Sequence, residues 1–415
     1  MTSSFPYEGG EQFFESEVIF WEATRFRKIY FLPNKRNGKL RSFPKNIELI
    51  NVSEHSKLVK FPLLGKILFS FLAFFNSNLY REIIYLILNG SDSIKFINFY
   101  RLYKSCVVLE KEKHKLKLAV MLMDSPPIVY SYWNSVGSYA ACLLKKKGVV
   151  RKVFSRAHGF DLYEERMPEN YMPLKRQFVN DIDKVFLLSE SAIEYYHEKY
   201  SAKRSKLALG RLGVFLPEIL PVYQYNRGEL RVLSVSYCVS VKRIDKIIIA
   251  LKHFTKKNPT MNVTWTHIGF GPLYNDFIEK LKSIDLPNFY FELPGELSNK
   301  EVLKRLKLNN FDIFVNASES EGVPVSIMEA MAFGVPAIAP DVGGIADLVS
   351  NDSGYLMPTE CSPEDIVKGI EWVISADHIF DFRVKARQKV YENFNADKNY
   401  PLFVKKLESI TAEPV

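Results

Sequence analysis

Short apolar runs of strand character alternate with helical segments along the second half of the chain. The runs are rich in Val, Ile, Phe and Tyr and occupy residues 232–237, 263–268, 288–293, 311–315 and 335–339. Helical patterns begin between them, near residues 243, 272, 298 and 325. Strands and helices that alternate at this spacing predict a parallel sheet with helices on both faces.

The first half shows a looser version of the same pattern. Its candidate strands are residues 28–32, 47–52, 127–133, 149–157 and 184–189. A long, mainly helical stretch rich in Phe, Leu, Ile and Tyr, residues 58–123, interrupts them. We interpret it either as an insertion that covers the sheet or as an interfacial platform. Its longest uncharged run, residues 67–80, is shorter than the roughly 18 to 20 residues that span a bilayer, so no transmembrane helix is predicted.

The length of 415 residues exceeds what one ordinary core supports, and we expect two domains. Residues 217–229 contain two prolines and a glycine and form the predicted linker. We predict an α/β fold with two Rossmann-like domains, residues 1–216 and 230–390, whose parallel sheets face a central cleft. Residues 391–415 are expected to pack back on the first domain. The first domain opens on a glycine loop and a helix, and the strand that normally precedes them is missing from the pattern.

Residues 316–344 carry the densest candidate chemistry. Glu321 lies in a loop after a predicted strand, and Glu329 lies within the first two turns of the helix that follows. Gly322 and Pro324 fit a tight turn into that helix, whose free N–H groups and positive dipole end point at the loop. This arrangement favours an anionic ligand.

The composition of the chain limits the class of protein, its partners and its compartment. With 47% hydrophobic and 25% charged residues the chain is globular, and its net charge of +9 favours an anionic partner without choosing among nucleic acid, nucleotide and membrane surface. The four cysteines are scattered and are interpreted as free thiols in a reducing compartment. Residues 1–14 lack the pattern of a signal peptide, so we expect a cytoplasmic protein.

The paired-glutamate segment resembles the nucleotide-sugar half of GT-B glycosyltransferases of the retaining family 4 type, the glycosyl transferases group 1. The residues that carry the resemblance are Ser318, Glu321, Gly322, Glu329, Ala330, Gly334, Pro336, Gly343 and Gly344. Residues 234–245, 267–272 and 293–302 extend it. In the first half, residues 5–13, 130–133 and 155–166 resemble members that build bacterial surface polysaccharides.

The resemblance implies a reaction. It is the transfer of a sugar, with retention, from a UDP- or GDP-linked donor to a saccharide acceptor, expected to be lipid-linked, in capsule or exopolysaccharide synthesis. No carboxylate nucleophile stands out, which fits a front-face mechanism in which the leaving phosphate takes the acceptor proton. No DxD-like carboxylate pair follows a strand, so neither a metal nor another cofactor is expected.

On the donor side, Lys242 is expected to supply positive charge to the leaving diphosphate, with Arg243 as a weaker candidate. Backbone groups of Gly322, Val323, Pro324 and Val325 would line the same site. The family usually adds an arginine after a glycine at a strand end; here these positions are Ser236 and Tyr237.

The resemblance also implies roles for the two glutamates. Glu321 would face the donor sugar and Glu329 would accept hydrogen bonds from the ribose hydroxyls. The competing interpretation is that Glu321 is a solvated loop residue and Glu329 is an exposed helix residue.

Glycines mark two further candidate contacts with the donor. The loop of Gly9 and Gly10 would approach the donor diphosphate, and Gly269 and Gly271 would let backbone approach the nucleotide. Ordinary turns are the alternative in both cases.

On the acceptor side, His158 follows a predicted strand, and relatives use a histidine here near the reacting sugar. His158 is therefore the third predicted catalytic residue, with Glu321 and Lys242. Asp161 would orient its imidazole or bind acceptor. A structural histidine and a helix N-cap are the competing roles.

A basic cluster, residues 145–152, and the Phe-rich residues 58–80 together suggest a surface that docks on anionic lipid. Singly, a lysine run is usually a solvated helix end and a Phe-rich run is usually core. The membrane-docking alternative stays open, on the inner face of the cytoplasmic membrane.

Two alternative functions remain. A catalytically degenerate GT-B protein that serves as a partner in a polysaccharide assembly complex is favoured by the loss of the usual arginine at Tyr237. A sugar-nucleotide epimerase or a phosphorylase would keep the fold but requires other acid and base residues. Nucleic-acid binding explains only the charge and leaves the paired glutamates unexplained, so no nucleic-acid partner is predicted.

Overall fold

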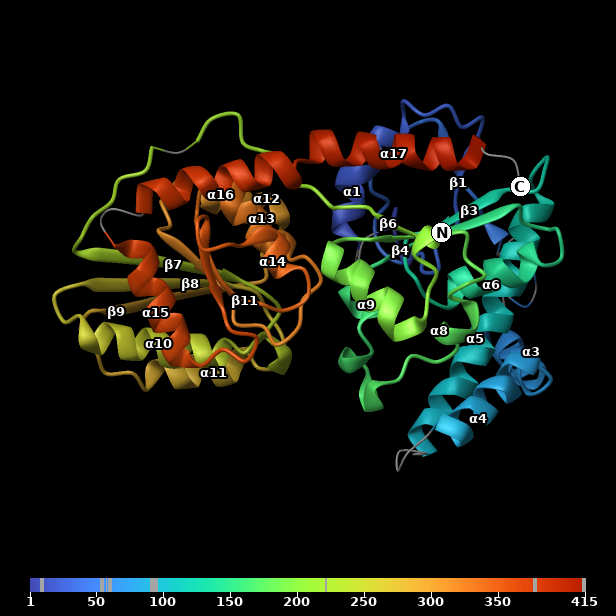
Figure 1. Ribbon diagram of the computed structural model, residues 1–415, viewed down its shortest axis with the longest axis horizontal. Helices are drawn as coiled ribbons and strands as arrows, with labels where there is room; N and C mark the ends of the chain where they lie inside the picture. The colour runs from blue at the N-terminus through green and yellow to red at the C-terminus, as the bar shows by residue number, and fades with distance from the viewer. Residues whose placement is uncertain are drawn as a thin grey trace. The chain divides into compact units, whose positions relative to one another are not determined.

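The computed structural model describes residues 1–7, 11–52, 56, 58, 62–89, 96–220, 222–375 and 379–412 (Figure 1). The chain forms two compact units, which are unit 1 (Met1–Gly210 with Tyr400–Val415) and unit 2 (Arg211–Asn399). Each unit is built on parallel strands connected by helices, as the alternation of apolar runs predicts.

Unit 2 contains a six-stranded parallel sheet in the order β12-β11-β10-β7-β8-β9. Its strands are β7 (Glu229–Val235), β8 (Asn262–Ile268), β9 (Phe289–Gly295), β10 (Ile313–Val315), β11 (Ala337–Pro340) and β12 (Gly354–Met357). Its helices are α10 (Ile244–Lys257), α11 (Tyr274–Lys282), α12 (Asn299–Leu308), α13 (Val325–Ala332), α14 (Ile345–Leu348), α15 (Pro363–Ile374) and α16 (Ile379–Asn393). Helices α10, α11 and α15 cover one face of the sheet, and α12, α13 and α16 cover the other (Figure 1).

The burial of the strands follows their place in that sheet. Every residue of the central strands β10 and β11 is buried, because helices cover both of their faces. The edge strand β9 leaves Tyr290 and Phe291 exposed. The sheet therefore holds the loops at its carboxyl edge on a rigid, fully packed centre.

Unit 1 contains a four-stranded parallel sheet and a separate parallel pair of strands. The larger sheet has the order β3-β4-β5-β6, with β3 (Ile128–Ser131), β4 (Lys152–Ala157), β5 (Lys184–Leu187) and β6 (Leu207–Leu209). The pair is β1 (Ile29–Phe31) with β2 (Ile47–Leu49). The α-helices are α1 (Gln12–Val18), α3 (Pro62–Phe74), α4 (Ser77–Asn89), α5 (Phe96–Met121), α6 (Val136–Lys145), α7 (Gly159–Leu162), α8 (Lys175–Phe178) and α9 (Glu190–Tyr200).

The predicted linker, residues 217–229, belongs to unit 2. Tyr223 Oη donates a hydrogen bond to Asp312 at 2.8 Å, and Tyr225 Oη donates to the carbonyl of Ile374 at 2.9 Å. These contacts fix the segment on unit 2, so the boundary falls between Gly210 and Arg211. The last helix, α17 (Ala396–Ala412), starts in unit 2 and belongs to unit 1 from Tyr400 onward.

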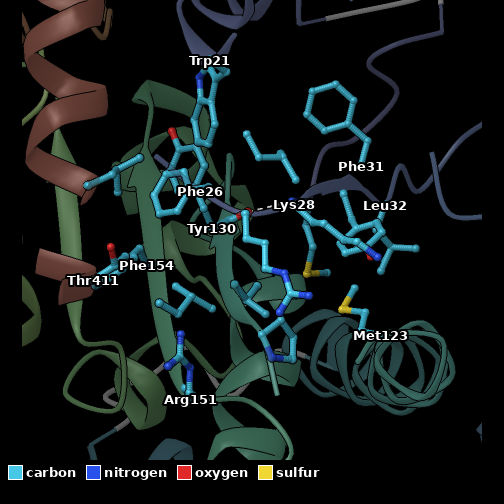
Figure 2. A pocket seen from close by; sticks show the side chains of 18 of the residues that line it. Trp21, Phe26, Lys28, Phe31, Leu32, Met123, Tyr130, Arg151, Phe154 and Thr411 are labelled. Carbon is cyan, nitrogen blue, oxygen red and sulfur yellow. Dashed lines mark hydrogen bonds between the residues drawn. The ribbon is translucent and has the colours of Figure 1, made fainter. Parts of the chain in front are cut away.

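A cavity of about 310 Å³ lies in unit 1 and is lined by β1, β3, the ends of α5 and α17, and Trp21 and Phe26 (Figure 2). Met1 and Thr2 also border this cavity. The amino group of Met1 donates to the carbonyl of Tyr130 at 2.7 Å, and Thr2 forms a parallel bridge with Pro33. Residues 1 and 2 therefore make strand-like pairings at the place where the sequence pattern lacks a first strand.

Within the described ranges, no single helix is long and apolar enough to cross a membrane. Helices α3 and α4 reach that length and composition only when they are taken together, as the segments Leu63–Phe74 and Ser77–Leu88, which are bent by 57°.

Candidate functional site

The candidate site of unit 2 lies at the carboxyl ends of two neighbouring parallel strands, β7 and β10. The chain leaves β7 toward β8 through α10 on one face of the sheet, and it leaves β10 toward β11 through α13 on the other. Such a reversal of strand order opens a crevice at the carboxyl edge, which is where open α/β sheets bind ligands. The loops after β7 and β10 carry Lys242 and Glu321.

Lys242 and Glu321 form a buried ion pair at this edge. Lys242 Nζ lies 2.5 Å from Glu321 Oε1, and their side chains are 18% and 8% exposed. Ser318 Oγ donates to the same oxygen at 2.7 Å, and Asn316 Nδ2 donates to it at 3.3 Å. Burial alone would raise the pKa of Glu321, but Lys242 and these hydrogen bonds lower it below its usual value. The carboxylate is therefore ionised.

The three donors converge on one oxygen of Glu321. Among the described residues, no hydrogen bond reaches the other oxygen, Oε2. A carboxylate held in this way by its neighbours presents its second oxygen as an acceptor for a ligand hydroxyl group. The alternative of a solvated loop residue is thus wrong for Glu321.

Arg243 joins the two loops by pairing with two protein carboxylates. Its guanidinium lies 2.5 Å from Glu319 and 3.1 Å from Asp245. The backbone N–H of Glu319 also donates to the carbonyl of Val241 at 2.9 Å. Arg243 therefore positions the loop of Glu321, and three of its five N–H donors are engaged by protein carboxylates.

The start of α13 supplies backbone donors beside the ion pair. Pro324 occupies the N-cap position, and the first intrahelical bonds run from Ile327 and Met328 to its carbonyl. Within the described part of the chain, the N–H groups of Val323, Val325 and Ser326 have no recorded acceptor in the protein. Unpaired N–H groups at a helix start favour an anion.

Glycines hold the turn under this helix. Gly343 has φ of +58°, and a Cβ atom on it would lie 1.9 Å from the carbonyl oxygen of Glu321. The N–H of Gly344 donates to the carbonyl of Gly322 at 2.7 Å. The turn after β11 therefore packs directly against residues 321 and 322, which explains why the sequence needs glycine there.

Gly269 and Gly271 pack against protein backbone as well. A Cβ on Gly269 would lie 1.8 Å from the carbonyl oxygen of Ser236, and one on Gly271 would lie 2.7 Å from that of Cys238. The N–H of Ser236 donates to the carbonyl of Ile268 at 3.0 Å. These glycines thus let the loops after β7 and β8 approach each other, which accounts for them as strand-ending turns. Tyr237 and Phe270, in the same loops, are half exposed.

Glu329 lies one turn into α13 and is buried. Asn299 Nδ2, from the start of α12, donates to its Oε1 at 2.5 Å. Burial raises the pKa of Glu329 to about 7, against the opposing hydrogen bond from Asn299. The alternative of an exposed helix residue is therefore wrong. Glu329 instead places a buried carboxyl group with a pKa of about 7 on the helix whose start forms the candidate anion site.

In unit 1, His158 follows β4 and is 7% exposed. Its ring lies 4.8 Å from that of Tyr132 and 4.6 Å from that of Trp133, between ring centroids. Neither ring nitrogen has a hydrogen-bond partner among the described residues. Burial and the neighbouring Arg156 guanidinium hold the pKa of His158 well below its usual value, so the imidazole is neutral. A buried polar ring without partners is uncommon and suggests a ligand-facing role.

Asp161 does not bind the imidazole of His158. Its carboxylate accepts the backbone N–H of His158 at 2.5 Å and that of Asn134 at 2.6 Å, and so ties the ends of β4 and β3 together. Burial raises the pKa of Asp161 to about 6, although Lys175 acts in the opposite direction. The prediction that Asp161 orients the ring is corrected, because the capping geometry directs the carboxylate to the backbone.

Sequence reasoning missed Glu11, which organises the same region. Its carboxylate accepts three successive backbone N–H groups, those of Ser3, Ser4 and Phe5, at 2.6 to 2.8 Å. It also accepts Trp133 Nε1 at 2.7 Å. Glu11 thus orients the indole that packs on His158. Gly10 and its neighbour Gly9, which were predicted to approach the donor, lie outside the described residues.

Two of the five cations in residues 145–152 are paired with carboxylates. Lys145 lies 2.8 Å from Asp183, and Lys146 lies 2.6 Å from Asp181. Lys152 is buried and donates to the carbonyl of Ile410 at 3.0 Å. Docking on anionic lipid by this cluster together with residues 58–80 therefore stays a prediction.

The second half of the chain is similar to a known family. Residues 217–396 match the family model of glycosyl transferases group 1. This match covers the ion pair, the start of α13 and Glu329.

Two curated relatives of the chain carry names from polysaccharide biosynthesis. The chain is 26% identical over 270 residues to the putative colanic acid biosynthesis glycosyltransferase WcaL of Escherichia coli, covering 61% of this chain and 64% of that protein. It is 32% identical over 237 residues to the amylovoran biosynthesis glycosyltransferase AmsK of Erwinia amylovora, covering 55% and 56%. The chain thus spans less than two thirds of the length of either relative.

Solved structures of similar fold cover the chain more completely. The lipopolysaccharide outer core galactosyltransferase WaaB matches with a TM-score of 0.67 at 15% identity, over 99% of this chain and 98% of that chain. Anabaena HepE in complex with UDP-glucose matches with a TM-score of 0.58 at 14% identity, over 72% and 82%. At these identities the likeness shows the fold alone, and the predicted α/β fold of the GT-B class is confirmed.

Proposed function

We propose that this protein is a retaining glycosyltransferase that moves a sugar from a UDP- or GDP-sugar to a saccharide acceptor in surface polysaccharide synthesis, with the acceptor linked to a lipid. The observation that supports it most is the Lys242–Glu321 pair, buried at the reversal of strand order beside the free N–H groups of α13. The family match of this half and the names of its relatives support the same class of reaction.

In this proposal the donor diphosphate lies against Lys242 and the N–H groups of Val323, Val325 and Ser326. Positive charge and fixed donors at this place stabilise the negative charge that develops as the diphosphate departs. Glu321 Oε2 accepts a hydrogen bond from a hydroxyl of the donor sugar, and the ion pair with Lys242 keeps that oxygen ionised. Glu329 accepts hydrogen bonds from the ribose hydroxyls.

The reaction proceeds on one face of the sugar. The bond between the anomeric carbon and the diphosphate oxygen breaks, and the diphosphate leaves with the electron pair. The acceptor hydroxyl oxygen then bonds to the anomeric carbon from the same face, and its proton passes to an oxygen of the leaving phosphate. In this proposal, positive charge from Lys242 and the backbone donors suffices without a metal ion or cofactor. His158 of unit 1 contributes a neutral N–H to the acceptor half of the reaction.

The test is a panel of UDP- and GDP-sugars incubated with the purified protein, with and without a membrane lipid extract that supplies acceptor. Nucleotide release from at least one donor is expected, and Glu321→Gln should abolish it. Glu371→Gln is the matched control, because Glu371 is exposed on α15 and pairs with Lys257 at the end of α10, neither of which belongs to the candidate site. Absence of release and of binding for every donor would refute the proposal.

A second candidate is a non-catalytic GT-B partner protein, and Tyr237 in place of the usual arginine favours it. A tyrosine supplies no positive charge, so Lys242 is left as the main cationic side chain for the diphosphate. Binding of a nucleotide sugar without release in the presence of every acceptor fraction would favour this candidate over the enzyme.

A further inference from the structure

Helices α3 and α4 expose an apolar surface that the proposed transferase chemistry does not use. They lie beside α5 at one end of unit 1 (Figure 1). Ten apolar or aromatic side chains on them or at their junction are more than half exposed, namely Leu63, Leu64, Ile67, Phe71, Phe74, Phe75, Tyr80, Ile84, Ile87 and Leu88. We call these ten residues the α3–α4 surface. At roughly 100 Å² each they expose on the order of 1,000 Å², above the 300 to 600 Å² of the largest patch on a typical monomer.

The inner faces of the same helices are packed, so the exposed surface is not a loose core. Ala73 and Leu79 are buried in the core that includes Leu102 and Leu109 of α5, and Phe69 is buried with its ring 5.6 Å from that of His114 on the same helix. The helices are therefore apolar on two faces, and only one of these faces has a partner in the protein. A surface helix that is apolar all round requires a second apolar environment.

Polar contacts fix the bend between the two helices. Asn76, at the junction, donates to Glu110 of α5 at 2.7 Å and accepts the backbone N–H of Asn78 at 2.9 Å. Glu82 of α4 is buried and accepts hydrogen bonds from Gln177 at 2.6 Å and from Tyr171 at 3.1 Å. The outer surface is thus presented in a defined shape.

The charges around this surface select its partner. Lys66 and Arg81 are exposed on α3 and α4, and Lys104 is exposed on α5. The carboxylates of the same three helices, Glu82, Glu110 and Glu112, are buried. An apolar surface bordered only by exposed cations on these elements matches the interface of an anionic lipid leaflet. A twofold contact between two copies would instead bring the same cations together.

We infer that the α3–α4 surface inserts into one leaflet of a membrane that contains anionic lipid, with the two bent helices lying in the interface. The inference places the membrane contact on α3 and α4, and it does not depend on the cations of residues 145–152. It stands independently of catalysis, because docking on lipid requires neither donor nor acceptor.

The test is flotation of the full chain with vesicles of phosphatidylcholine containing 30% phosphatidylglycerol, compared with phosphatidylcholine alone, in the absence of any nucleotide. We expect the wild type to partition onto the anionic vesicles about tenfold more strongly and to lose this preference, but not all binding, at high salt. Ile67→Gln with Phe71→Gln, one turn apart on α3, should reduce the partition by about tenfold or more, because it removes two apolar groups at helical spacing.

The matched control is Leu308→Gln with Leu402→Gln, two side chains that are each 64% exposed, like Ile67 at 63% and Phe71 at 60%, but lie on α12 and α17. The control should float like the wild type. Titration of UDP separates this inference from the proposed function, since both double variants should bind UDP as the wild type does. Lys66→Glu with Arg81→Glu should remove the preference for anionic vesicles.

Three results would overturn the inference. The first is no flotation of the wild type with either vesicle. The second is equal flotation of the α3 variant and the wild type. The third is a concentration-dependent dimer in sedimentation that the α3 variant abolishes while vesicles have no effect, which would assign the surface to a second copy of the chain.

Discussion

Removing either member of the Lys242–Glu321 pair should damage both stability and activity, whereas removing both should damage activity alone. The variants are Lys242→Met, Glu321→Gln and the combination of the two. Both side chains are less than one fifth exposed. Lys242→Met therefore leaves the Glu321 carboxylate without its cation, and Glu321→Gln leaves the Lys242 ammonium without its anion. Breaking a buried pair in this way costs about 3 to 5 kcal/mol, while replacing both partners by neutral groups is often nearly neutral. We take the lower figure, because Lys242 retains some solvent contact.

The assay is calorimetric unfolding of the full chain together with nucleotide release from the best donor. For a unit of this size 1 kcal/mol shifts Tm by about 2 to 4 °C. Each single variant should therefore lower the Tm of unit 2 by about 6 to 12 °C, and the double variant should lie within about 4 °C of the wild type. All three should lose about 100-fold or more in kcat/KM, because each lacks the cation at the leaving diphosphate, the carboxylate at the donor sugar, or both. A double variant that recovered activity together with stability would refute a catalytic role for the pair.

Three further outcomes follow from single sites. His158→Ala should lower kcat about 10- to 1,000-fold and leave UDP binding by unit 2 unchanged in titration calorimetry, because the ring lies in unit 1; weakened UDP binding would contradict its assignment to the acceptor half. Gly343→Ala should destabilise unit 2 by about 2 kcal/mol or more in urea unfolding, since φ is +58° and a Cβ would lie 1.9 Å from the carbonyl oxygen of Glu321; unchanged stability would show that this turn can shift. Burial raises the folded pKa of Glu329 to about 7 from its ordinary value of 4.5, so native stability falls as pH rises from about 4.5 to 7. Glu329→Gln should therefore stabilise unit 2 by up to about 3 kcal/mol at pH 8 and little at pH 4 while it weakens nucleotide binding, and a gain at both pH values would refute ionisation of Glu329 as the cause.

Local patterns in the sequence predicted the sheet of unit 2 well, because its central strands are continuous apolar runs bounded by turn residues. The strands β6 and β12 were not predicted, since Leu207–Leu209 and Gly354–Met357 are short and take their strand character from pairing with β5 and β11. Tertiary pairing of this kind leaves little trace in a single sequence.

Contacts of the candidate site could be predicted where both residues lie in one short segment. They could not be predicted where the two residues are far apart in the sequence. Glu321 and Glu329 share one motif, and the Ser318-x-x-Glu321 spacing resembles a capping pair, so its hydrogen bond could have been anticipated. The bond from Asn299 to Glu329 joins two helices and has no local signal. The ion pairs of Lys145 with Asp183 and of Lys146 with Asp181 likewise join distant segments and have no local signal.

Titration calorimetry of UDP and GDP into the wild type and Lys242→Met tests most directly the claim that the loops after β7 and β10 bind a nucleoside diphosphate. Lys282→Met, an exposed lysine on α11, serves as the control for lost charge. We predict that the wild type and the control bind one of the two nucleotides with equal affinity and that Lys242→Met binds it at least about tenfold more weakly. Equal binding by Lys242→Met, or no binding of either nucleotide by the wild type, would contradict the claim.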